Sequence, residues 1–162
     1  MPQLDFMIVA DFVRAEGAVL HMIAAGIDTI YTPVVPALHR LGVGIRLTMT
    51  PAEAQYHHQI EIILQTEDGE RLAQVNGGFA PPGDVPELPP GVRPSIAIPF
   101  NMNIPLPAYG RYSLELLVDA NSLKSIDLTV SPPPAGLASR PTITGHGPSE
   151  SGETGRQIGH DP

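Results

Sequence analysis

Apolar residues recur at every second position in several short stretches of the chain, which is the period of a β-strand with one buried face. The clearest case lies in Tyr109–Val130, where the alternation runs over residues 112–118, breaks at residues 119–122 and resumes over residues 126–130. Two amphipathic strands joined by a short polar turn predict a β-hairpin. Such a hairpin is marginal alone, so its apolar face has to close against another sheet.

The same pattern predicts further strands. They are expected at Leu4–Ala10, Ala18–Ala25, Leu41–Met49, Tyr56–Gln65, Arg71–Phe79 and Ser95–Ile104, with a possible short strand through Ile30 and Tyr31. Phe12–Gly17 is expected to turn the chain, and Glu67-Asp68-Gly69 to form a hairpin turn because Asp-Gly favours positive φ. Leu4–Ala10 is apolar on both faces, which favours a place inside the sheet. Pro99 lacks an N–H, so its strand is expected at an edge or with a bulge.

About eight mostly antiparallel strands and no helix longer than a turn predict an all-β fold. Stiff proline-rich crossings such as Ala80–Pro94 favour a single sandwich, immunoglobulin-like or C2-like, over a barrel that needs only tight turns. The sandwich is expected to occupy residues 1–131 as one domain. Residues 132–162 are rich in Pro, Gly and Ser with isolated apolar residues, so they are expected to be a disordered tail.

Charge and composition restrict the kinds of partner and chemistry that the chain can have. The net charge is −8, and Lys and Arg form no run, which argues against a nucleic-acid partner. No cysteine is present, which excludes disulfides and thiolate chemistry. No window approaches the eighteen apolar residues that span a bilayer, and the start of the chain lacks the pattern of a secretion signal. A cytoplasmic location without membrane contact is therefore expected.

Four segments carry a resemblance to a known family. They read LDFMIVADFV, AVLHMIAAGIDTIYTP, RLGVGIRLTMT and PAYGRYSLELLVD, the last with a Pro-x-x-Gly-x-Tyr pattern. Together the chain resembles an uncharacterised family of small bacterial proteins that is known only as a domain of unknown function. The resemblance covers about residues 3–131 and leaves out the tail. It implies a β-sandwich and brings no catalytic residue, ligand or cofactor.

The sequence offers two kinds of candidate metal site. His57 and His58 are adjacent, so on a strand their rings point to opposite faces and cannot grip one ion; His58 is expected to be partly buried with a hydrogen bond. Calcium is the stronger hypothesis, because C2-like sandwiches bind it with aspartates on loops at one end. The candidates are Asp11, Asp68 and Asp119, with Asp28 and Asp84 also in loops. The hypothesis requires Asp11, Asp68 and Asp119 to cluster, whereas turn chemistry explains Asp68 and Asp119 equally well.

The remaining features favour a binding surface over catalysis. No Ser lies between glycines in the part expected to be ordered, no phosphate-cradling loop precedes a helix, and the four tyrosines without a tryptophan make a weak carbohydrate platform. Gly42 and Gly44, with Arg46, lie on the outer face of one strand, and Pro99 lies on the expected edge strand. The leading hypothesis is a non-enzymatic, cofactor-free module that meets a protein partner or itself through a sheet edge or face. The alternative is a calcium- or small-ligand-binding sandwich.

Overall fold

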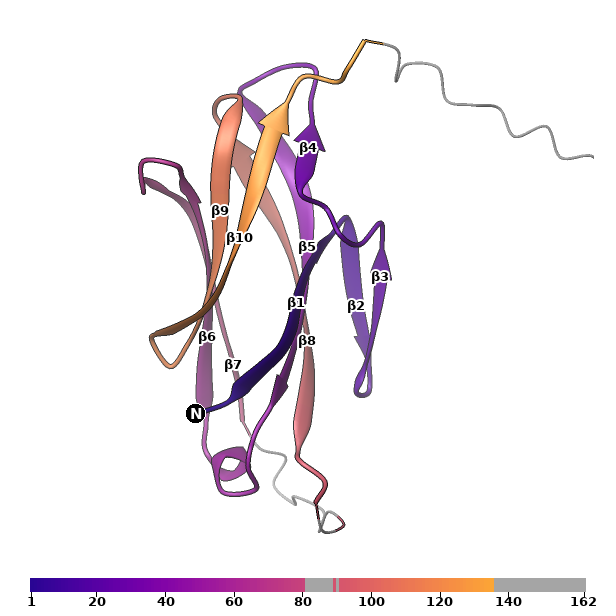
Figure 1. The fold of residues 1–162 in the computed structure, drawn as a ribbon, viewed down its shortest axis with the longest axis vertical. Coiled ribbons are helices and arrows are strands. Elements are labelled where there is room, and N and C mark those ends of the chain that lie inside the picture. The colour runs from indigo at the N-terminus through magenta and orange to yellow at the C-terminus, as the bar shows by residue number, and fades with distance from the viewer. Residues whose placement is uncertain (81–88, 90, 136–162) are drawn as a thin grey trace, which may run out of the picture.

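The computed structural model describes residues 1–80, 89 and 91–135. It contains ten strands and one short 3-10 helix, in an order that follows the chain (Figure 1). The elements are β1 (Gln3–Ala10), β2 (Phe12–Glu16), β3 (Val19–Ile23), β4 (Thr29–Tyr31), β5 (Ala37–Thr48), η1 (Glu53–Gln55), β6 (His58–Thr66), β7 (Arg71–Phe79), β8 (Ser95–Leu106), β9 (Gly110–Val118) and β10 (Asn121–Ser131). The all-β class is confirmed.

Two sheets face each other and enclose the core. One has five strands in the order β4-β10-β9-β6-β7, in which only the β4–β10 pair is parallel. The other has three antiparallel strands in the order β1-β5-β8. Figure 1 shows β6, β9 and β10 on one side of the molecule and β1, β5 and β8 on the other. This arrangement confirms the sandwich, and a two-stranded β2–β3 hairpin stands outside it.

The core is built from the alternating apolar positions that the sequence marks out. Each inward residue of a strand is followed by an outward one, so the two inner faces meet as a continuous apolar layer. The fully buried large side chains include Leu41, Ile45, Leu47, Ile60, Ile62, Leu64, Ile104, Leu106, Leu114, Leu116 and Leu128. At the end of this layer the Tyr112 hydroxyl donates a hydrogen bond of 2.6 Å to the carbonyl oxygen of Ala108. That bond fixes the corner that leads into β9.

The β9–β10 hairpin is confirmed, with a tighter turn than expected. Its loop is only Asp119-Ala120, both with positive φ (51° and 63°), and β10 begins at Asn121. The expected break over residues 119–122 is therefore too long, because the chain pairs with β9 again immediately and absorbs the misfit in a register shift between Ser122 and Lys124. The β6–β7 hairpin is also confirmed, with Gly69 at φ +83° in its turn.

The N-terminal part differs from the sequence expectation. Phe12–Glu16 is strand β2 and not a turn, and β3 pairs with β2 rather than returning beside β1. β1 is an edge strand, not a central one. Both of its faces are apolar for another reason: Met7 faces the core, whereas Ile8 on the other face lies beside Gly44, which the β2–β3 hairpin covers.

β8 is an edge strand of the three-stranded sheet, as Pro99 predicts. It carries no bulge, because its pairing with β5 runs without a register shift from Ala37–Leu106 to Thr48–Ser95. No helix in the described residues is long and apolar enough to cross a membrane. Most of the proline-rich crossing and the tail beyond residue 135 lie outside the described residues, so the expected disorder of the tail stays a prediction.

Candidate functional site

The outer face of β5 is covered by the chain's own β2–β3 hairpin. A Cβ atom at Gly42 would lie 3.0 Å from backbone atoms of Phe12, and one at Gly44 would lie 2.8 Å from Met22 Sδ. Both glycines are buried. The expectation that a partner docks on these two residues is therefore corrected, because the hairpin already fills the space that the missing side chains leave.

The side-chain amide of Asn101 hydrogen-bonds this hairpin to the sandwich. Asn101 on β8 accepts a hydrogen bond of 3.0 Å from the Val13 N–H through Oδ1 and donates one of 2.7 Å from Nδ2 to the Val13 carbonyl oxygen. The Asn101 side chain thus makes the two hydrogen bonds with Val13 that the backbone of a neighbouring strand would otherwise make. The other two surface candidates stay exposed: Arg46 has its Nε 3.4 Å from Asp5 Oδ2, and Pro99 lies on the outer face of β8.

The aspartates proposed as calcium ligands do not converge. Asp119 lies beside the first residues of β6, where its Oδ1 accepts a hydrogen bond of 2.9 Å from the Gln59 N–H. Asp68 follows the other end of β6, so nine residues of strand, about 30 Å, separate the two carboxylates. Asp11 lies between β1 and β2, and Asp84 lies outside the described residues. The clustering that the calcium hypothesis requires is therefore missing, and no three His, Asp or Glu side chains of the described residues could hold a metal ion.

His58 is buried and hydrogen-bonded, as its place on an apolar face predicts. Its Nδ1 lies 2.7 Å from Asp119 Oδ2 and its Nε2 lies 3.0 Å from the Glu53 carbonyl oxygen. Each ring nitrogen thus lies within hydrogen-bonding distance of an oxygen atom. His58 therefore ties η1, the start of β6 and the β9–β10 turn together.

The Asp119 carboxylate is held in its charged form. Partial burial alone would raise its pKa, but the hydrogen bonds from His58 and from the Gln59 N–H outweigh burial, and the pKa lies below the usual value of 3.8. These hydrogen bonds give Asp119 a structural role. It joins the turn to β6, a role that needs no metal ion.

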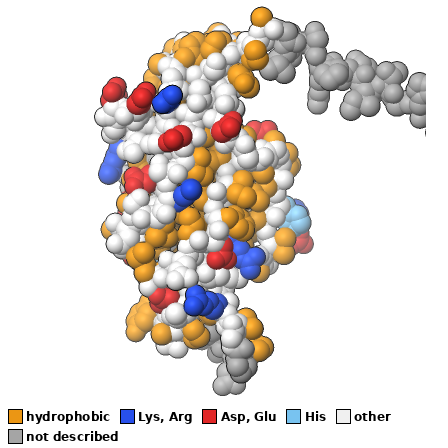
Figure 2. Space-filling view, viewed as in Figure 1, with side chains coloured by type: hydrophobic (Ala, Val, Ile, Leu, Met, Phe, Trp, Pro, Cys, Tyr) orange, Lys and Arg blue, Asp and Glu red, His pale blue; other side chains and the backbone are white. Residues whose placement is uncertain are grey.

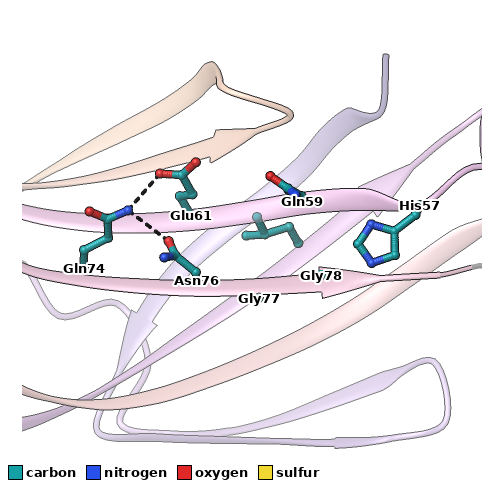
Figure 3. A pocket seen from close by; sticks show the side chains of 8 residues that line it. His57, Gln59, Glu61, Gln74, Asn76, Gly77 and Gly78 are labelled. Atoms are coloured by element: carbon teal, nitrogen blue, oxygen red, sulfur yellow. Dashed lines mark hydrogen bonds between the residues drawn. The ribbon is translucent and has the colours of Figure 1, made fainter.

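An open groove of about 480 Å³ lies on the outer face of β6 and β7. Figure 3 shows polar side chains from both strands along it, with glycines of β7 at its base. Its lining residues are His57, Gln59, Ile60, Glu61, Gln74, Asn76, Gly77 and Gly78. At one end, a Cβ atom at Gly78 would lie 2.9 Å from His57 Cε1, so the glycine makes room for the imidazole ring.

The side-chain amides in this groove are oriented by one another. Gln74 Nε2 donates hydrogen bonds of 3.0 Å to Glu61 Oε2 and to Asn76 Oδ1 (Figure 3). The two hydrogens of the Gln74 amide are thereby used, which leaves its Oε1 as an acceptor and Asn76 Nδ2 as a donor, with no further partner among the described residues. The groove can therefore supply one acceptor and one donor, side by side, to a group that approaches β7.

β7 itself is an edge strand. It is the last strand of the five-stranded sheet, and within the described part of the chain its only strand neighbour is β6. Its sequence RLAQVNGGF holds one charged residue, Arg71, at its first position, and no proline. Gln74, Asn76 and Gly78 are exposed on the outer side. An edge of this length without lysine or proline presents unpaired backbone groups that another strand can bind.

The inner side of β7 borders an incompletely closed part of the core, which we name the β7–β8 seam. Gly77 approaches the Phe100 ring so closely that a Cβ atom would lie 3.2 Å from it. The inward side chains of this seam are only half-buried, although Ile104 and Leu106 farther along β8 are fully buried. The seam consists of Ala73, Val75 and Phe79 on β7 and Ile96, Ile98, Phe100 and Met102 on β8.

Sequence reasoning placed the open edge at β8 and did not single out β7. The signal was present, because a nine-residue strand with alternating apolar and neutral polar residues follows a strong hairpin turn. What the sequence does not contain is strand order. Only the pairing of β9 with the other side of β6 leaves β7 at the rim.

Comparison with protein families then identifies the group to which this sandwich belongs. A model of a family of unknown function, DUF6941, matches residues 5–131. The chain belongs to this family. The match runs from the third residue of β1 to the last residue of β10, and it confirms the resemblance drawn from the four sequence segments.

The other comparisons add no function to this DUF6941 member. No curated protein matches it significantly. Among solved structures it is similar to "Crystal structure of the C-terminal domain of wzt", with a TM-score of 0.43 and 11% sequence identity. That likeness covers 82% of this chain and 74% of the other. A TM-score this low supports no argument about function.

Proposed function

We propose that the chain is a non-enzymatic protein-interaction module that accepts an extended segment of a partner along the edge of β7. The observation that carries the proposal is the nine-residue edge beside the half-buried apolar side chains of the β7–β8 seam. A strand added there would satisfy the edge backbone groups. Its alternate side chains would cover the seam, which combines hydrogen bonding with apolar burial.

The other edges are less suited to such addition. β8 contains Pro99 and Pro105, each of which lacks an N–H. β1 carries Asp5, and its Val9 carbonyl oxygen already accepts hydrogen bonds from Gly26 and Ile27. Such features keep edge strands from pairing with other chains, and in β7 the one irregularity is a register shift near its first residue, Arg71.

The edge of β10 is also unsuited to the addition of another strand. β4 pairs with its last three residues, and the open part carries Lys124 and Asp127.

On the face seen in Figure 2, basic side chains lie among acidic ones without forming a patch, while hydrophobic side chains gather over its middle. The scattered charge, with a net charge of −8, favours a protein partner over nucleic acid.

Selection from a library of random linear peptides tests the proposal on the full chain. Enriched peptides are expected to alternate apolar and polar residues, and their addition is expected to shift the backbone amide NMR signals of β7. The variant Val75→Lys places an ammonium group in the seam and is expected to weaken peptide binding by at least about tenfold.

Val19→Lys provides the matched control, because Val19 is 58% exposed on β3, in the outer hairpin. This variant is expected to bind the peptides as the native chain does, and thermal melts check that both variants are folded. Peptides that shift amides elsewhere while β7 stays unchanged would disprove the proposal. This NMR result does not depend on the stability of either variant.

A further inference from the structure

We infer that the strand that pairs with β7 is the β7 of a second copy of this chain, in antiparallel register about Val75. This inference rests on the proposed use of the β7 edge and names its partner. Two copies related by a two-fold axis through this edge would form one continuous sheet of ten strands. Such an interface uses the same surface on both copies, so it closes as a dimer and does not propagate.

The register follows from the side-chain amides of the groove. Residues directly opposite each other in an antiparallel pair point to the same face. Pairing about Val75 places Gln74 of one copy opposite Asn76 of the other, and this occurs twice because of the symmetry. Gln74 Oε1 then faces the partner's Asn76 Nδ2. These are the acceptor and the donor that the groove leaves without partners within the described residues.

Other symmetric registers lack this complementarity. Pairing about Gln74 would set Gln74 against its own copy, and pairing about Asn76 would set Asn76 against its own copy. Only the register about Val75 joins the free acceptor of one residue type to the free donor of the other at both positions. The hydrogen bond from Gln74 to Glu61 therefore fixes, in each free copy, the amide orientation that favours this register.

The remaining pairs of this register also fit. Val75 meets Val75 at the centre, a β-branched pair of the kind that sheets favour. Ala73 meets Gly77, two small residues on the side that faces the seam, where the half-buried Phe100 ring lies against Gly77. The register ends before Arg71, because the pairing of β7 with β6 is shifted between Ala73 and Arg71 and leaves Leu72 as an extra residue.

The charge of the molecule does not oppose this contact. The only charged residue of β7 is Arg71, and it lies at the end of the strand. The Glu61 side chains lie on β6, so in the dimer three strand spacings of about 4.8 Å, roughly 14 Å, separate them. That distance exceeds the Debye length of about 8 Å at physiological salt, so their repulsion is largely screened.

Sedimentation velocity of the full chain at increasing concentration tests the inference. The native chain is expected to pass from monomer to dimer. Gln74→Glu with Asn76→Asp places like charges opposite each other twice and is expected to raise the dimer dissociation constant by about tenfold or more. Gln74→Lys with Asn76→Asp places opposite charges together twice and is expected to leave that constant equal to or below the native value.

The second double variant also reports the register. In a dimer paired about Gln74 the two lysines would repel, and in one paired about Asn76 the two aspartates would repel, so either register predicts a weaker dimer. Ser125→Asp with Thr129→Glu adds the same charge as the first variant on exposed positions of β10, and it is expected to dimerise as the native chain does. Both β7 positions are exposed, so these substitutions spare the core.

A native chain that stays monomeric would overturn the self-pairing. Loss of the dimer in Gln74→Lys/Asn76→Asp, or a dimer that ignores both double variants, would overturn it as well. Peptide-induced shifts of the β7 amides would in that case still support the β7 edge as a binding site for other chains. The failure of this inference is thus distinguishable from the failure of the proposed function.

Discussion

A few residues at the turns decide where the strands of this sandwich begin and end. His58 and Asp119 link the start of β6 to the β9–β10 turn, and the hydrogen bonds of the Asp119 carboxylate to His58 and to the Gln59 N–H join segments about sixty residues apart in the chain. Asp119 also begins a two-residue turn in which both residues have positive φ. Turns of this kind match the twist of the flanking strands, which explains why the hairpin closes so tightly.

Replacing Ala120 with glycine is expected to stabilise the protein. Ala120 has φ +63°, a conformation that costs a non-glycine residue about 1–2 kcal/mol, although glycine adds entropy to the unfolded chain. The net gain in the free energy of unfolding is expected to be about 0.5–1 kcal/mol, measured by urea denaturation. Ala97→Gly, at the third residue of β8, serves as the control and is expected to lower stability. Equal losses for both variants would show that the strain at Ala120 is negligible.

The hydrogen-bonded Asp119 predicts a dependence of stability on pH. Because its pKa in the folded chain lies below the usual value of 3.8, its contribution is complete above that value and is lost as the pH falls through the lower, folded value. Asp119→Asn is expected to flatten this acid-side loss in plots of the unfolding free energy against pH. Native and variant curves that fall in parallel below about pH 4 would contradict the assignment.

At the scale of elements, the β2–β3 hairpin depends on glycines below it. The nearest atoms to a Cβ at Gly42 belong to the Phe12 backbone, whereas the nearest atom to one at Gly44 is Met22 Sδ, at the end of a flexible side chain. Gly42→Ala is therefore expected to cost about 1–3 kcal/mol of unfolding free energy, and Gly44→Ala distinctly less. Denaturant titration of both variants measures the difference. A larger loss for Gly44→Ala would contradict the description of the hairpin contact.

The elements also show which part of the fold is readable from sequence. Alternation located nearly all strands of the two main sheets, because each has one buried face. It failed at Phe12–Glu16, where a half-polar strand pairs with β3 and is hydrogen-bonded to Asn101, a contact 88 residues away. It also assigned β1 to the interior, because local pattern cannot reveal that an apolar outer face is covered by a hairpin rather than by another strand.

At the scale of the whole molecule, the candidate site depends on strand order. The sequence correctly identified β8 as an edge through Pro99, but the wider opening arises because β7 and β8 lie at the same side of the sandwich in different sheets. The calcium hypothesis depended on long-range pairing in the same way. It required Asp11, Asp68 and Asp119 to cluster, but the length of β6 separates Asp68 from Asp119. Long-range pairing, which no single segment encodes, decides both outcomes.

The central claim is that the β7 edge is an interaction surface of the folded chain. Amide hydrogen exchange, followed residue by residue in the full chain at low and high protein concentration, tests it most directly. At low concentration the outward-pointing amides of β7 are expected to exchange quickly while those bonded to β6 are protected, and concentration is expected to protect the outward ones selectively. Slow exchange of every β7 amide at the lowest concentration would contradict the claim, because the edge would then already be covered within one chain.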